Sequence, residues 1–79
     1  MKRLRRTITV NHKEYEIFLG LKRVIYNTVT VYNIYFFPDN PYEKKVKPEL
    51  IKKGFKSEKE ALTFGKKHVK QIYISALNK

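Results

Sequence analysis

Apolar and polar residues alternate over the first third of the chain. In RRTITV, residues 5–10, Ile8 and Val10 fall on one side and the two threonines on the other, which predicts a short strand. The same period continues through EYEIFLGLKR, residues 14–23, with Tyr15, Ile17, Leu19 and Leu21 on the inward side and Glu14, Glu16, Phe18 and Lys22 on the outward side. Asn tolerates positive φ, so NHK, residues 11–13, predicts a tight hairpin turn. Gly20 is a candidate β-bulge.

Residues 24–37, VIYNTVTVYNIYFF, are rich in β-branched and aromatic side chains, which favours another strand, with a turn near Tyr26 and Asn27. One face would carry Val29, Val31, Asn33, Tyr35 and Phe37. The other would carry Thr28, Thr30, Tyr32, Ile34 and Phe36, and we interpret this second set as the outer face. It is too apolar to be fully solvated. Either the strand twists and its faces exchange roles, or part of the outer face meets a partner.

Three prolines and Asn40 predict a loop over residues 38–48. The next segment, ELIKKGF at residues 49–55, fits either a short helical turn ending at Gly54 or an edge strand. At eleven residues, the segment 38–48 is long for a loop in a compact domain and is therefore a functional candidate. With the lysines that follow it, residues 38–56 are treated as one long basic loop.

A helix is predicted after Ser57. This serine is a good N-cap, Glu60 completes a capping box, and Glu58 adds a favourable charge to the first turn. The expected buried stripe is Ala61, Leu62, Gly65, His68, Val69, Ile72 and Ala76, with Lys59, Lys66, Lys67 and Lys70 on the opposite side. The helix should run to about Ala76, with Asn78 helping to end it.

These elements predict a single α+β domain over residues 1–79, in which a three-stranded antiparallel sheet packs on one C-terminal helix in the order β-β-β-α. One sheet face would stay open. A chain of 79 residues buries only about 60% of its unfolded surface, so the core is small.

The charge changes the functional picture. Eighteen Lys and Arg against seven Asp and Glu give a net charge of +11. Residues 1–13 hold five cations and no acid, residues 14–43 are slightly acidic, and residues 44–79 hold eleven Lys and three Glu. Two basic ends around an acidic middle favour a polyanion partner, and nucleic acid is the obvious one.

The candidate nucleic-acid-binding residues fall in four groups. The basic N-terminal arm, residues 1–6, supplies Lys2, Arg3, Arg5 and Arg6; the second strand supplies Lys22 and Arg23; the long basic loop supplies Lys44, Lys45, Lys47, Lys52, Lys53 and Lys56; and the open sheet face supplies Thr28, Thr30 and Tyr32. Fourteen Lys against four Arg predict salt-sensitive phosphate contacts with modest sequence selectivity.

The sequence argues against an enzyme. His12 and His68 have no carboxylate at a spacing typical of a triad or a metal site, and no glycine-rich phosphate loop is present. We therefore expect no catalytic residue, metal or other cofactor and no small-molecule substrate, although a small ribonuclease leaves no local motif. The absence of cysteine and of a long apolar run predicts a cytoplasmic protein without a membrane partner.

The segment GFKSEKEALTFGKKHVK resembles the helix of small DNA-binding domains that read DNA with a sheet, namely the plant AP2 type and the arm-binding domains of tyrosine recombinases. Phe55, Ser57, Glu58, Glu60 and Ala61 carry the resemblance. It covers about twenty residues, and it implies a three-stranded sheet backed by a helix. The arginine and tryptophan pattern of the AP2 strands is absent, so no base contact is transferred.

The sequence thus predicts a small non-enzymatic nucleic-acid-binding domain, with DNA favoured over RNA and mainly phosphate-backbone contacts. The alternative is a protein–protein interaction module, such as a small accessory or inhibitory factor of a phage or mobile element that acts as a homodimer. That alternative depends on the apolar residues Tyr32, Ile34 and Phe36 being exposed.

Overall fold

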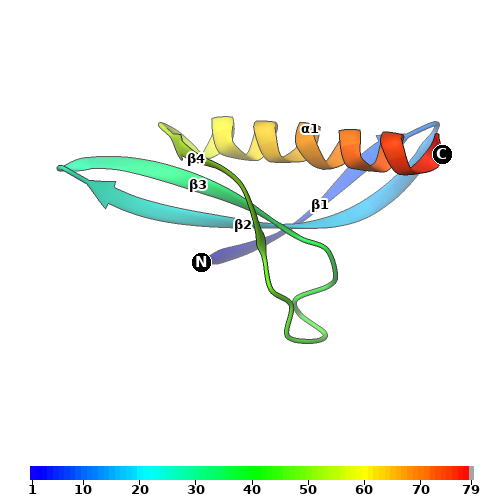
Figure 1. Ribbon diagram of the computed structural model, residues 1–79, viewed down its shortest axis with the longest axis horizontal. Coiled ribbons are helices and arrows are strands. Elements are labelled where there is room, and N and C mark those ends of the chain that lie inside the picture. Colours follow the sequence, from blue (N-terminus) through cyan, green and yellow to red (C-terminus); the bar gives the residue numbers. More distant parts are fainter. Residues whose placement is uncertain (79) are drawn as a thin grey trace.

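A computed structural model describes residues 1–78 as a four-stranded antiparallel sheet with one helix packed across it (Figure 1). The elements are β1 (Lys2–Val10), β2 (Lys13–Tyr26), β3 (Val29–Phe37), β4 (Glu49–Phe55) and α1 (Glu58–Leu77). The α+β class, the antiparallel sheet and the helix that follows it agree with the sequence prediction. The number of strands does not, because residues 49–55 form an edge strand.

The strands pair in chain order, β1-β2-β3-β4, so each strand lies beside its neighbours in sequence. Both hairpin turns between the first three strands have two residues with positive φ: Asn11 and His12 join β1 to β2, and Asn27 and Thr28 join β2 to β3. Two successive left-handed residues match the twist of the flanking strands. The predicted turn at NHK is confirmed.

The core lies between the sheet and α1. Its centre is formed by Leu19 of β2 and Ile34 of β3, which are completely buried. The helix reaches this depth through Gly65: a Cβ built there would lie 2.7 Å from Cγ1 of Ile34 and 3.5 Å from Cδ1 of Leu19. The inward set predicted for β2 is confirmed, since Ile17, Leu19 and Leu21 are buried and Tyr15 packs against the core.

The helix begins as its capping sequence predicts. The Glu60 N–H donates to Oγ of Ser57 over 3.1 Å, and at the other end the Asn78 N–H donates to the Ile74 carbonyl. The predicted stripe is right for Ala61, Gly65 and Val69, which are buried. It is wrong for His68, Ile72 and Ala76, which are exposed, while Phe64, Tyr73 and Ile74 contact the core instead.

Two segment assignments are corrected. The expected N-terminal arm, residues 1–6, is not a separate arm, because Lys2–Arg6 pair with Ile17–Leu21 of β2. A fourteen-residue β2 needs a long partner, and β1 supplies it from Lys2 onward. The expected loop over 38–56 is a loop only to residue 48. Gly20 also marks no bulge, since both of its neighbouring registers run through it without a shift.

The face assignment of β3 is wrong. Leu21 lies opposite Ile34, and Leu19 lies opposite Phe36. The expected outer set therefore faces α1, and Val31, Asn33, Tyr35 and Phe37 lie on the open face. The dimer alternative loses the observation that motivated it, because Ile34 is completely buried.

Candidate nucleic-acid interface

The β2–β3 hairpin projects beyond the rest of the molecule (Figure 1). β1 pairs with β2 only as far as Leu21, and β4 pairs with β3 only as far as Tyr32. We call residues 22–33, the part of this hairpin beyond the β1 pairing, the ribbon; β4 flanks its base as far as Tyr32, and beyond that residue the ribbon is two-stranded. It continues for three further residue pairs, ending with Tyr26 opposite Val29. The ribbon contributes to the elongated shape of the molecule, 44 × 25 × 18 Å.

Cations surround the base of this ribbon. The basic root is formed by Lys22, Arg23, Lys52, Lys53 and Lys56. Lys22 and Arg23 are adjacent in β2, so they point to opposite faces of the sheet. The three lysines arrive from β4 and the residue after it, because Phe55 pairs with Tyr32 and Lys52 pairs with Ile34. Thus segments about thirty residues apart in sequence bring their charges to one end of the sheet.

Carboxylates are scarce around the root. Residues 17–38 contain no Asp or Glu, so the ribbon itself is free of negative charge. β4 has one acid, Glu49, at its start, and the next acids in the sequence are Glu58 and Glu60 in the first turn of the helix. Within residues 1–78, the side chains of Lys22, Arg23 and Lys53 form no ion pair. Their charges are therefore available to a partner.

A shallow groove runs along the open face of the ribbon. It is lined by Val24, Tyr26, Val31, Asn33, Lys53 and Gly54. Asn33 is buried, and its Oδ1 accepts a hydrogen bond of 3.1 Å from the Gly54 N–H. This bond holds β4 against β3 at the register shift and fixes Lys53 beside the ribbon.

The ribbon tip carries exposed apolar and polar side chains together. Ile25, Tyr26 and Val29 are 68%, 70% and 55% exposed. The turn residues Asn27 and Thr28 lie at the far end, also exposed. The turn region is predictable from the sequence but the exposure of the apolar tip is not, because an exposed β-branched run looks the same as a buried one in sequence.

The polar residues predicted for the open sheet face are placed differently. Thr28 is in the exposed turn, so it is accessible. Thr30 is exposed but pairs with Ile25 on the helix-facing side of the sheet. Tyr32 also lies on that side, half-buried against the core, so it is not a free stacking platform.

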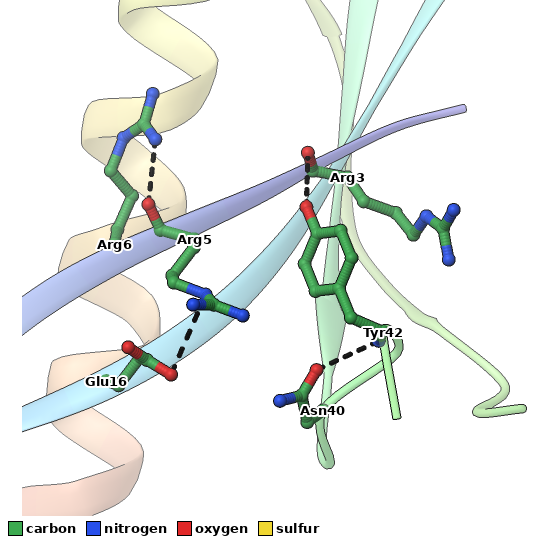
Figure 2. Close-up of polar contacts among 6 residues, drawn as sticks. All are labelled: Arg3, Arg5, Arg6, Glu16, Asn40 and Tyr42. Atoms are coloured by element: carbon green, nitrogen blue, oxygen red, sulfur yellow. Dashed lines mark hydrogen bonds and ion pairs between the residues drawn. The ribbon is translucent and has the colours of Figure 1, made fainter. Parts of the chain in front are cut away.

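The N-terminal cations form a second group, separate from the root. Arg3 and Arg5 lie on the open face of β1, on either side of the Tyr42 ring (Figure 2), with their guanidinium carbons 5.1 Å and 5.3 Å from its centroid. Arg3 donates to the Pro41 carbonyl over 3.1 Å, and the Tyr42 hydroxyl donates to the Arg3 carbonyl over 3.0 Å. Arg5 also lies near Phe18 and 3.7 Å from Glu16. These arginines hold the loop against the sheet.

The remaining predicted cations are dispersed. Lys2 and Arg6 belong to the helix-facing side of β1, where Nη1 of Arg6 donates to the Arg5 carbonyl over 2.8 Å (Figure 2). Lys44 pairs with Asp39 over 3.0 Å, and Lys45 and Lys47 are exposed in the loop. Of the predicted cations, those of the root therefore come to one end of the sheet, on both of its faces, and the N-terminal and loop cations lie elsewhere.

No group of three or more potential metal-ligating His, Asp or Glu side chains occurs within residues 1–78. In the same residues, no helix is long and apolar enough to cross a membrane. No protein-family model matches the chain, and neither does any curated protein or solved structure.

Proposed function

We propose that this protein is a small non-enzymatic nucleic-acid-binding domain that inserts the β2–β3 ribbon into a groove of duplex DNA. The observation that carries the proposal is the acid-free ribbon with the five cations of the basic root around its base. Lysine and arginine at the root would contact phosphates on both sides of the groove. Phosphate contacts supply most of the affinity of such interfaces.

The dimensions favour DNA over duplex RNA. The major groove of B-DNA, about 12 Å wide, admits a two-stranded β-ribbon. The major groove of A-form RNA is deep and narrow, so a ribbon cannot reach its base edges. The tip offers Asn27 and Thr28 as hydrogen-bonding groups and Tyr26 as an apolar surface. With few such groups, sequence selectivity should be modest.

Binding of a labelled 20-base-pair duplex, measured over a range of salt concentrations, tests the proposal. The triple variant Lys22→Ala, Arg23→Ala, Lys53→Ala removes three charges from the root, while Lys66→Ala, Lys67→Ala, Lys70→Ala removes three from the helix. Each lost phosphate contact lowers the slope of log K against log salt by about 0.9. The root variant should therefore lose up to about 2.7 from the slope, and the helix variant should lose much less.

Equal losses in the two variants would mean that the root is not the interface. Absence of binding at about 50 mM salt, where phosphate contacts are strong, would end the proposal altogether. Duplex RNA of the same sequence serves as the competitor, and it should displace the DNA poorly.

A further inference from the structure

The first strand has an open edge. β1 pairs only with β2, so the backbone on its other side has no strand partner. The Arg3 and Arg5 carbonyls already accept hydrogen bonds from the side chains of Tyr42 and Arg6, so the open part of this edge is centred on Thr7–Val10. Such an edge is a template for a further strand. Proteins often protect exposed edges with charged side chains, and Lys2, Arg3, Arg5 and Arg6 meet that need here. Their positive charge repels a second copy of the same edge but attracts an acidic chain.

A groove accompanies this edge. It lies between β1 and the second half of α1 and is lined by Thr7, Ile8, Thr9, Lys66, Lys67 and Lys70. Its lining has three cations and no carboxylate. Glu14 and Glu16 pair with Thr9 and Thr7, but they point to the open face, on the side of the sheet away from α1. An occupant of the groove would therefore meet only positive side chains along the helix.

The spacing of the helical lysines fits an extended chain. Lys66 and Lys70 are four residues apart, which is about 6 Å along a helix axis. Side chains on one face of a strand recur every second residue, at about 6.6–6.8 Å. Every second side chain of a strand added to β1 would point to the side of the sheet on which Lys66 and Lys70 lie.

We propose that the β1 edge binds an acidic extended segment of another protein, which adds as a fifth strand and carries a carboxylate at every second position. Its backbone would pair with β1, and its carboxylates would lie along Lys66 and Lys70. Main-chain hydrogen bonds would supply affinity and the alternating acids would supply selectivity, as in other complexes formed by strand addition. The site is distinct from the basic root, so it does not depend on DNA binding.

The probe is a nine-residue peptide in which Thr and Glu alternate, and the control has the same composition with its four Glu residues grouped together. Binding is followed by chemical shifts of the backbone amides of the full chain. The alternating peptide should bind more tightly and shift the amides of Thr7, Ile8 and Thr9. Lys66→Ala, Lys70→Ala should weaken it roughly three- to tenfold, whereas the charge-matched Lys22→Ala, Lys53→Ala should have little effect.

Two peptides N-methylated at alternate positions report on backbone pairing without changing the protein. One places its methyl groups toward β1 and should not bind, and the other should bind normally. Equal binding of the two methylated peptides would overturn the proposal, because backbone pairing would then not be needed. Equal binding of the alternating and grouped peptides would also overturn it, because non-specific charge attraction would then explain the affinity. Displacement of the peptide by duplex DNA, or dimerisation through β1 in sedimentation experiments, would assign the edge to a different partner and would also overturn it. A negative result with these peptides would not bear on the DNA-binding experiment with the root variant.

Discussion

At the scale of single residues, Gly65 sets how closely the helix approaches the sheet. A methyl group at this position would lie 2.7 Å from Cγ1 and 3.2 Å from Cδ1 of Ile34, which is completely buried. Alanine is better than glycine in a helix by about 1 kcal/mol, but overpacking a core usually costs about 1–3 kcal/mol. The two effects oppose each other. Because the short contact is to a buried β-branched residue, we expect the overpacking cost to exceed the gain in helix propensity, so that the net effect is destabilising.

We expect Gly65→Ala to lower the free energy of unfolding by about 1 kcal/mol, and the melting temperature by about 4–8 °C for a domain of this size. Thr63→Ala is the matched control, because that exposed helical position gains helix propensity without a new core contact. Urea unfolding of both variants measures the difference. A Gly65→Ala protein as stable as Thr63→Ala would show that Ile34 moves aside at no cost.

At the scale of elements, loop 38–48 is held to the sheet mainly by one side chain. The Tyr42 ring contacts Arg3, Arg5 and Phe18 and bonds to the β1 backbone. Within the loop, the Tyr42 N–H also donates to Oδ1 of Asn40 over 2.9 Å (Figure 2). The ring contacts should matter more than the hydroxyl, because the hydroxyl is exposed to competing water.

Tyr42→Ala should reduce the free energy of unfolding by about 1–2 kcal/mol and speed amide hydrogen exchange in residues 38–48. Tyr42→Phe keeps the ring and loses one hydrogen bond, so its loss should stay below about 1 kcal/mol, with exchange close to that of the parent. If the two variants behave alike, the hydroxyl bond and not the stacked guanidinium groups anchors the loop.

The predictability of the elements also follows from particular residues. Alternation placed residues 5–10 of β1 and the inner face of β2, and the capping box placed the helix start, but the first residues of β1 were expected to be an arm. Alternation could not orient β3, since both of its faces are apolar. Turn length could have done so: any two-residue turn places odd positions of β2 on the same face as even positions of β3. Once Leu21 is inward, Ile34 must be inward too.

The edge strand β4 was ambiguous in sequence for a different reason. The stretch Lys52-Lys53-Gly54 shows no alternation, and charged residues are typical of edge strands rather than of strand interiors. The convergence of Lys22 and Arg23 with the β4 lysines depends on this pairing. This convergence could not be predicted from the sequence, because residues 49–55 fitted either a helical turn or an edge strand.

At the scale of the whole molecule, the net charge of +11 is spread over an elongated body, and residues 1–78 form only two ion pairs, both exposed. Repulsion among like charges therefore opposes folding. Raising the salt concentration from about 10 mM to about 150 mM shortens the Debye length from about 30 Å to about 8 Å. The melting temperature should rise by several degrees over this range.

Chloride and sulfate compared at equal ionic strength separate screening from specific anion binding. Similar curves indicate screening, while an added gain with sulfate indicates an anion site. A melting temperature that falls with salt would mean that attractive ion pairs, and not repulsion, dominate the electrostatic energy of the folded chain.

The order of the elements has a consequence for biosynthesis. The four strands precede α1 in the chain, so a ribosome completes the sheet before it makes the helix that covers Leu19 and Ile34. Until α1 forms, the sheet presents this apolar face to solvent. A chain that ends at residue 56 should therefore expose this face, and it should bind an environment-sensitive dye that the full-length protein does not bind.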